Sequence, residues 1–322
     1  MTRVTRILLA LAKAAVSVAL IAFIVRSVDG AALLAAMRRL PVSSLAAAAL
    51  LLMAQAVIIG WRWHRIVVLL GGQLPPRDAV RWVFVGMFFN NALPTSVGGD
   101  AVRIWLLRKR GAPLRLSLGS VAIERGSGIV ILALMVSACV PAVWAMLDGR
   151  AFRVALAWVG PVLLAGLVVL ALADKLVVGW LPRRLEESLR WLGHELRRLA
   201  TRPLALAEVV ALGVLASFTG LLAAYLMGEG LGIAIGLPAY IVLVGGSVLL
   251  SVLPISLGGW GVREVSMVAL FGSVGAGAEQ ALALSLLWGV LPLLISAPVG
   301  LLCWRSLSTV ASGGEEAANQ TT

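Results

Sequence analysis

The same ten-residue motif interrupts two apolar stretches of the chain. Residues 94–103 read PTSVGGDAVR and residues 254–263 read PISLGGWGVR, so Pro, Ser, two Gly, Val and Arg recur at the same offsets. We call this sequence the repeated motif. Proline and paired glycines break a helix, and backbone polar groups freed at membrane depth are tolerated only inside protein or beside a wet cavity. Two broken helices in corresponding halves of a hydrophobic chain therefore predict a transport site between them.

The composition is typical of a membrane protein. The chain is 61% hydrophobic with a mean hydropathy of +1.00, and only 13% of it is charged, well below the roughly 25% of a soluble domain. We expect an all-α polytopic membrane protein with a single transmembrane domain over residues 1–311 and a disordered tail over residues 312–322. The net charge of +12 falls in short segments between apolar runs, which indicates contacts with lipid headgroups and no nucleic-acid binding.

Six stretches are each long and apolar enough to cross a bilayer, which takes about 17–25 residues. They are residues 7–25, 43–61, 129–147, 154–173, 204–227 and 281–303. Two further stretches are split by the repeated motif, residues 82–93 with 101–107 and residues 238–253 with 262–273. An arm of about 12 helical residues rises only about 18 Å, short of the roughly 30 Å hydrocarbon core. Each split stretch is therefore predicted to be a re-entrant helical hairpin with the motif at its tip.

The distribution of Lys and Arg predicts the orientation of these segments. With the N-terminus inside, the inner segments hold 18 Lys and Arg residues and the outer segments hold five, so both termini are predicted to be cytoplasmic. The two hairpins then start from opposite sides, and residues 1–150 and 151–310 form an inverted repeat, a design that binds substrate near the midplane.

Residues 174–203 carry a helical stripe of leucines, which predicts an amphipathic helix on the inner surface. Residues 29–40 are predicted to form a shorter helix on the outer face.

The sequence contains no pattern typical of a catalytic or metal site. Cys139 and Cys303 both lie in apolar runs without a second ligand at metal spacing, and neither His64 nor His194 lies in a span near the repeated motif. No P-loop is present. We therefore expect a protein that is not an enzyme and that uses no cofactor or metal.

Charged residues in and beside the broken helices form the candidate site. A charge at the centre of a span costs about 2.5–3.5 kcal/mol and usually faces a cavity with a partner. In one interpretation, ion pairs between Asp100 and Arg103, and between Glu124 and Arg125, only hold the hairpin in place. In the other, Arg103, Arg125 and Arg263 line a cavity and receive a phosphate, to which the planar and permanently charged guanidinium is well suited.

The glycines and asparagines near the motif extend this candidate set. Each glycine pair precedes a helix whose unpaired first amides suit an anion, although a tight turn alone would also use glycine. Asn90 and Asn91 can contact a ligand at the hairpin tip or cap the backbone of the loop. The predicted substrate-binding residues are Asn90, Asn91, Pro94, Ser96, Gly98, Gly99, Asp100, Arg103, Glu124, Arg125, Ser256, Gly258, Gly259, Arg263 and Glu264.

An aromatic and basic cluster flanks the first hairpin. Its members are Trp61, Arg62, Trp63, His64, Arg65, Arg81 and Trp82. Tryptophan and basic residues are enriched where a helix meets the membrane surface. We therefore interpret this cluster as an interfacial belt, separate from the site.

Three motifs taken in order resemble a known family. The chain reads NNALPTSVGGDAVR, then ERGSG, then LPISLGGWGVRE, which is similar to the transmembrane domain of lysylphosphatidylglycerol synthase, the flippase-like domain of multiple peptide resistance factors. The resemblance covers nearly the whole chain. It implies a membrane protein that moves a phospholipid, glycolipid or polyprenyl-linked lipid between leaflets. The chain ends at Thr322 without the soluble aminoacyl-transferase domain of full-length resistance factors, so we expect a stand-alone member without lysyl-transfer activity.

The sequence therefore predicts a flippase of the cell (inner) membrane whose cargo is an anionic lipid. Two alternatives stay open: a membrane accessory subunit of a glycolipid or glycosyltransferase pathway, and an ion-coupled transporter of a small solute. In the first alternative Asp100 or Glu264 would act as a base, and in the second Glu124 or Glu264 would take a proton. The expected partner is the lipid substrate, and a homodimer or a glycosyltransferase or lipid-synthesis partner is compatible with the sequence.

Overall fold

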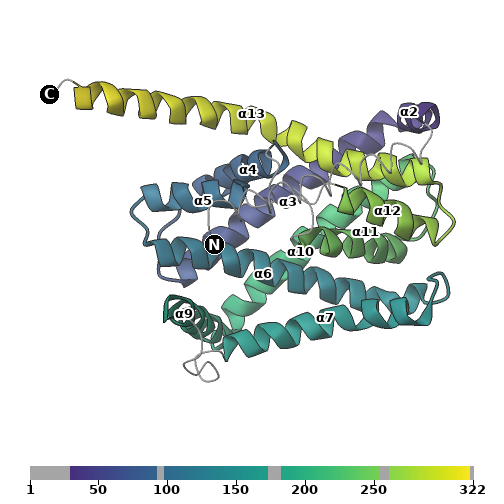
Figure 1. Ribbon diagram of the computed structural model, residues 1–322, viewed down its shortest axis with the longest axis horizontal. Helices are drawn as coiled ribbons and strands as arrows, with labels where there is room; N and C mark the ends of the chain where they lie inside the picture. Colours follow the sequence, from purple (N-terminus) through teal and green to yellow (C-terminus); the bar gives the residue numbers. More distant parts are fainter. Residues whose placement is uncertain (1–29, 93–97, 173–182, 254–260, 320–322) are drawn as a thin grey trace, which may run out of the picture.

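The computed structural model describes residues 30–92, 98–172, 183–253 and 261–319, and every regular element in these ranges is a helix (Figure 1). Five helices are long and apolar enough to cross a membrane. They are α3 (Val42–Leu69), α6 (Leu114–Cys139) with its continuation η1 (Val140–Val143), α7 (Arg150–Ala171), α10 (Pro203–Gly230) and the first part of α13 (Ala278–Asn319). The protein is thus an all-α polytopic membrane protein. Five of the six predicted spans are confirmed, and the sixth, residues 7–25, lies outside the described residues.

Proline and glycine set several of the helix ends. The shorter helices are α2 (Gly30–Arg39), α4 (Pro76–Ala92), α5 (Gly98–Lys109), α9 (Arg183–Ala200), α11 (Leu237–Val252) and α12 (Val262–Gly272). Pro76 begins α4 and Pro203 begins α10, positions at which the missing N–H leaves no helical hydrogen bond unmade. Gly111 separates α5 from α6 with a φ of 87°, a left-handed conformation that favours glycine and ends a helix.

Two helical hairpins form where the sequence predicts them. α4 packs on α5 and α11 packs on α12, and each pair flanks one copy of the repeated motif. The backbones of α4 and α5 touch at Gly86 and Gly99, so that a Cβ on Gly99 would overlap the carbonyl oxygen of Gly86. Only glycine permits so close an approach. The interiors of the two motif copies, residues 93–97 and 254–260, lie outside the described residues.

The two hairpins lie at opposite ends of the bundle (Figure 1). α4 and α5 share a core with the second half of α3, in which Trp63 packs near Leu107. α11 and α12 share a core with the first half of α3, in which Leu52 belongs to the same cluster as Phe271. The described arm ends that adjoin the motif therefore face the middle of the bundle, where Asn91 of α4 and Val252 of α11 line the same cavity. This is the arrangement that an inverted repeat requires, and the inverted relation of the two halves across a membrane stays a prediction.

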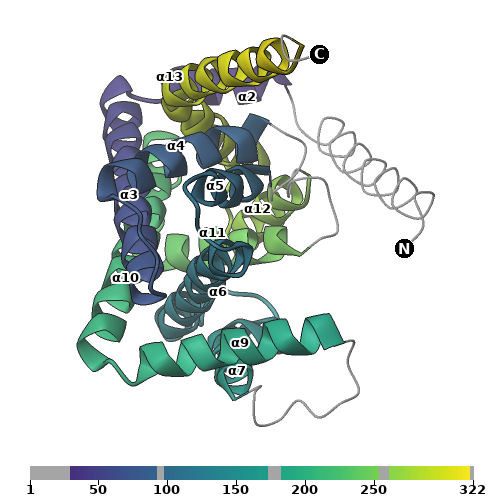
Figure 2. The ribbon, with the colours of Figure 1, turned by 90° about the vertical axis from the view of Figure 1, so that its left-hand side faces the viewer.

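Helix α9 lies across one end of the bundle, next to α6, α7 and α10 (Figures 1 and 2). On one face, Leu192 and Leu196 pack against Ile66 of α3. At the start of α6, Arg115 donates a hydrogen bond of 2.7 Å to the backbone carbonyl of Glu187. The predicted amphipathic helix is thus confirmed, and its place on the inner membrane surface stays a prediction.

The span predicted at residues 129–147 begins much earlier than expected, at Leu114. Glu124 and Arg125, which precede the predicted span, therefore lie inside the helix. The earlier start is compatible with the apolar interior because the serines of this segment satisfy their hydroxyls locally. Ser117, for example, donates a hydrogen bond of 3.1 Å to the carbonyl of Pro113.

Helix α13 extends beyond the predicted span at residues 281–303 and ends at Asn319. The sequence predicts disorder from residue 312. Residues 315–319, however, read EEAAN, and Glu and Ala are strong helix formers. The helix therefore continues through the segment for which disorder is expected.

The inverted arrangement predicts opposite accessibility for the outer ends of α5 and α12. The background carries Cys139→Ser and Cys303→Ser, so that no native thiol reacts. Arg108→Cys, in the last turn of α5, should react with an impermeant thiol reagent only from the inside, and Ser273→Cys, at the end of α12, only from the outside. Labelling is measured by gel shift in intact cells and inverted vesicles. Labelling of both positions from one side would contradict the inverted repeat.

Gly99→Ala should destabilise the first hairpin, because the added methyl group must force α4 and α5 apart at Gly86. Overpacked sites of this kind lose about 1–3 kcal/mol, which should appear as a lower melting temperature in detergent. Gly166→Ala in α7 is the matched control, since its new Cβ meets nothing within 4 Å and Ala is the better helix former. Equal melting temperatures for the two variants would rule out the close crossing.

Candidate functional site

Two adjoining cavities lie between the hairpins, with volumes of about 560 Å³ and 290 Å³. We call them the larger and the smaller cavity. Residues of α3, α4, α6 and α13 line both of them: Gln55, Ile59, Asn90, Asn91, Glu124, Arg125 and Trp288. The cavities therefore share one wall, and charged side chains of α6 belong to it.

The larger cavity has a charged part and an apolar part. Arg62 and Asp100 line the charged part, beside the shared Glu124 and Arg125. The apolar part is formed by Ile129, Leu132, Val248, Leu249 and Val252. The smaller cavity adds two arginines, Arg103 and Arg263. The site can therefore accommodate an anionic group next to hydrocarbon.

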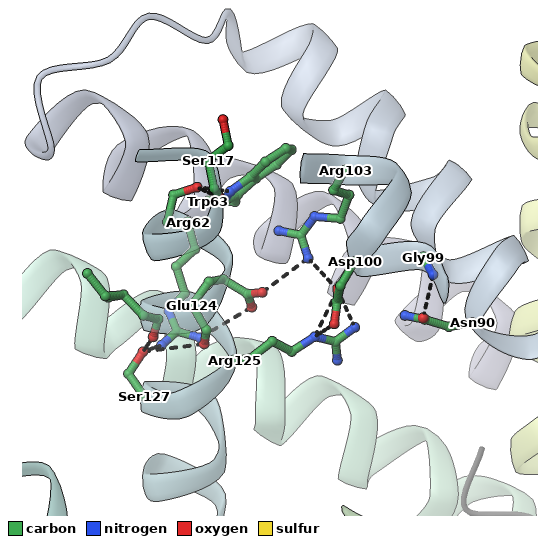
Figure 3. Close-up of polar contacts among 12 residues, drawn as sticks. Arg62, Trp63, Asn90, Gly99, Asp100, Arg103, Ser117, Glu124, Arg125 and Ser127 are labelled. Carbon is green, nitrogen blue, oxygen red and sulfur yellow. Dashed lines mark hydrogen bonds and ion pairs between the residues drawn. The ribbon is translucent and has the colours of Figure 1, made fainter. Parts of the chain in front are cut away.

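Glu124 lies at the centre of an arginine cluster and is buried (Figure 3). Its Oε2 accepts a hydrogen bond of 3.2 Å from Nη1 of Arg103, and its Oε1 lies 3.8 Å from Nη1 of Arg62. Arg62 is held in turn by two hydrogen bonds, from Nε to the carbonyl of Val209 at 3.1 Å and from Nη2 to the hydroxyl of Ser127 at 2.6 Å. One carboxylate thus connects α3, α5, α6 and α10.

Asp100, in the first turn of α5, pairs mainly with Arg125 (Figure 3). Nε and Nη2 of Arg125 donate to Oδ1 of Asp100 at 3.2 Å and 3.0 Å, while Nη1 of Arg103 is 3.5 Å away. The predicted pair of Asp100 with Arg103 is confirmed. Arg125 attracts Glu124 electrostatically but makes no described ion pair or hydrogen bond with it, because consecutive helical residues point in different directions.

Arg103 is buried with an incomplete set of hydrogen bonds. Its guanidinium lies over the ring of Trp63, 4.2 Å from the ring centroid, and Trp63 is fixed by a 3.2 Å hydrogen bond to the hydroxyl of Ser120. Nε and Nη2 of Arg103 have no hydrogen-bond partner among the described residues. Unsatisfied donors of a buried guanidinium beside a cavity are suited to an anionic ligand.

Arg62, Trp63 and Trp82 are buried, so the interfacial-belt interpretation is wrong for these three residues. Their exposed fractions are 2%, 0% and 7%. The sequence does contain a signal for Arg62. Gln55, Ile59 and Arg62 are spaced by four and three residues, which places them on one face of α3, and all three line the larger cavity. A polar Gln on that face of an apolar helix indicates a face turned away from lipid.

Arg263 and Glu264 form a compact unit at the start of α12. Arg263 donates to Oε1 of Glu264 from Nη2 at 2.5 Å and from Nε at 3.0 Å, and its Nε is 3.3 Å from the hydroxyl of Ser285 on α13. Oε2 of Glu264 accepts a hydrogen bond of 2.6 Å from the amide of Gly261 and so caps the helix. Glu264 therefore has a structural role, while Arg263 reaches the smaller cavity.

One amide at the start of each of α5 and α12 has a side-chain partner. In α5, the amide of Gly99 donates to Oδ1 of Asn90 at 2.8 Å, and in α12 the amide of Gly261 donates to the capping carboxylate just described. Asn91 donates to the carbonyl of Met87 at 2.8 Å. Asn90 therefore caps the start of α5 and Asn91 bonds within α4, and contact of either residue with a ligand stays a prediction.

The predicted site residues that the structure describes gather around the two cavities. Those that line one or both cavities are Asn90, Asn91, Asp100, Arg103, Glu124, Arg125 and Arg263. Gly98 and Gly99 begin α5, and Glu264 contacts the cavity-lining Arg263. Pro94, Ser96, Ser256, Gly258 and Gly259 lie outside the described residues.

The fold and the site define a polytopic membrane protein with a charged internal cavity between two helical hairpins. The family model for the lysylphosphatidylglycerol synthase TM region matches residues 10–300, so the chain belongs to this family. The resemblance carried by the three motifs is thereby confirmed. No curated protein matches the chain. Membership of this family indicates a function related to membrane lipids.

Asp100→Asn should destabilise the protein more than Asp78→Asn does. The first change removes a buried carboxylate that lies between the buried Arg103 and the half-exposed Arg125, and leaving a buried charged group with fewer partners costs about 1–3 kcal/mol. Asp78 also pairs with an arginine, Arg110 at 2.6 Å, but both of those side chains are partly exposed, and such pairs contribute about 0–1 kcal/mol. Melting temperatures in detergent should separate the two variants, and equal shifts would contradict the network.

Proposed function

We propose that the protein moves an anionic lipid between the two leaflets of its membrane. The lipid is a phospholipid, a glycolipid or a polyprenyl-linked lipid, and arginines at the two hairpins hold its phosphate. The observation that carries the proposal is the larger cavity of about 560 Å³, which combines charged and apolar walls. Such a cavity matches an amphiphile better than it matches a small polar solute.

The charges in and beside the cavities favour an anion. Among the described residues, four arginines meet three carboxylates: Arg62, Arg103, Arg125 and Arg263 against Asp100, Glu124 and Glu264. One positive charge is therefore left without a carboxylate. A guanidinium holds a phosphate through two parallel hydrogen bonds and keeps its charge inside protein, so an anionic headgroup is the ligand that this site accommodates best.

The change from charged to apolar residues along the cavity wall favours a lipid over a free phosphate as the ligand. Along α6, the lining changes from Glu124 and Arg125 to Ile129 and Leu132 within two turns. A headgroup at Arg125 would thus have apolar side chains beside it for the start of its hydrocarbon tails. The placement of the two hairpins at opposite ends of the bundle supports transport by alternating access to this site.

Transport is tested in liposomes that contain the purified protein and fluorescent phosphatidylglycerol. A membrane-impermeant quencher reports how fast the labelled lipid reaches the outer leaflet, and the protein should accelerate this movement over protein-free liposomes. Arg263→Ala should slow it about tenfold or more, because hydrogen bonds to a charged group contribute about 1.5–3 kcal/mol. Arg65→Ala is the matched control, since Arg65 pairs with Glu208 at 2.6 Å and lines neither cavity.

The same assay separates the translocase from the two alternatives. Phosphatidylglycerol that binds the protein but stays in its leaflet would favour the accessory role. Uptake of a water-soluble solute that depends on pH, without lipid movement, would favour the ion-coupled transporter. Movement of no anionic lipid, with phosphatidylglycerol, a glycolipid and a polyprenyl phosphate each tested, would refute the proposal.

A further inference from the structure

Glu124 stands between the two cavities with a different arginine on each side. It lines both cavities, whereas Arg62 lines only the larger one and Arg103 only the smaller one. Its two carboxylate oxygens are divided in the same way, with Oε2 at 3.2 Å from Arg103 and Oε1 at 3.8 Å from Arg62. One carboxylate is thus within reach of two buried cations (Figure 3).

The two arginines differ in how firmly they are held. Arg62 uses Nε and Nη2 to bind Val209 and Ser127, so only its Nη1 faces Glu124. Arg103 has Nε and Nη2 without a hydrogen-bond partner among the described residues. Arg103 therefore has two unsatisfied donors, which are buried and meet an incoming anion once its side chain turns toward the smaller cavity, while Arg62 is fixed in a position where it can receive a carboxylate.

We propose that Glu124 is an exchangeable counterion shared by Arg103 and Arg62. In the empty site it neutralises Arg103. An anionic headgroup that binds Arg103 in the smaller cavity displaces Glu124, which turns to Arg62. This inference rests on the proposed function in one respect, which is the identity of the anion as the headgroup of a lipid.

The exchange requires little movement. Oε1 of Glu124 needs to approach Nη1 of Arg62 by about 1 Å to reach the 2.7–2.9 Å of a charge-assisted hydrogen bond. Without Arg62, the displaced carboxylate would be buried with only the longer-range attraction of Arg125, which is unfavourable for a buried charge. Arg62 is then a positioning residue that acts on the ligand through Glu124. An anion leaving Arg103 would let Glu124 return, so the same exchange assists release.

The test is a double-mutant cycle on binding, measured by fluorescence anisotropy of labelled phosphatidylglycerol with the full chain in detergent. Arg62→Gln should weaken binding about tenfold, because displaced Glu124 then has no ion-pair partner and keeps only the longer-range attraction of Arg125. Glu124→Gln should tighten binding several-fold, because the internal competitor is gone. In the Glu124→Gln background, adding Arg62→Gln should change the Kd by less than about twofold.

The controls separate this exchange from general damage. Arg65→Gln removes the other arginine contact between α3 and α10 and should leave the Kd unchanged. Arg62→Lys keeps the charge and should restore most of the affinity. If Arg62→Gln does not fold, Ser127→Ala provides the same test more gently, because it removes one hydrogen bond that holds Arg62; its smaller loss of affinity should also vanish with Glu124→Gln.

Three results would overturn the inference. An equal loss from Arg62→Gln in both backgrounds would make Arg62 a direct ligand of the phosphate. An unchanged Kd in both would mean that Glu124 stays on Arg103. Wild-type protein that binds none of phosphatidylglycerol, an anionic glycolipid and a polyprenyl phosphate would leave no anion to drive the exchange. The liposome assay tests the proposed function independently of this binding test. If the protein moves lipid but the effects of Arg62→Gln and Glu124→Gln on the Kd simply add, only the exchange is refuted. If the two effects depend on each other but the protein moves no lipid, only the translocase is refuted.

Discussion

The carboxylate of Glu124 is the contact on which the arrangement of the central helices depends. A charge inside a membrane domain is stable only when it is paired and hydrogen-bonded. Glu124 on α6 meets this requirement through Arg103 on α5 and Arg62 on α3, and Arg62 extends the network to the backbone of α10. Helices from both halves of the chain are therefore held in one relative position. The same contact forms the wall between the two cavities.

Close backbone packing supplies the rest of the stability, since apolar side chains gain little by leaving lipid for protein. α4 and α5 meet at Gly86 and Gly99, and α6 and α7 meet at Gly160, whose amide donates a 3.0 Å hydrogen bond to the hydroxyl of Ser137. In each case a small residue brings two helices together where a larger one would clash. The hairpins can consequently be short and still pack tightly, although neither arm spans a membrane by itself.

The pairing of the arginines with carboxylates lowers the affinity of the site for an anion. An anion that enters must compete with Asp100 and Glu124, so part of its attraction to the arginines is offset by the displaced carboxylates. Binding is therefore weaker than three unpaired guanidinium groups would give. Under the proposed transport function, moderate affinity is an advantage, since conduction through any site needs favourable binding and easy release.

The sequence by itself determined the membrane class, five described spans and both hairpins, because hydropathy and the helix-breaking effect of Pro and Gly are local properties. It also identified the carboxylates of the site and three of its four arginines, Arg103, Arg125 and Arg263, since charged residues are rare in apolar helices. Only the tertiary structure decided which charges pair: Glu124 with Arg103 and Arg62, and Asp100 with Arg125. The burial of Arg62 was likewise a tertiary outcome. Whether a side chain meets lipid, solvent or another charge depends on which helices pack around it, and residues distant in sequence set that packing.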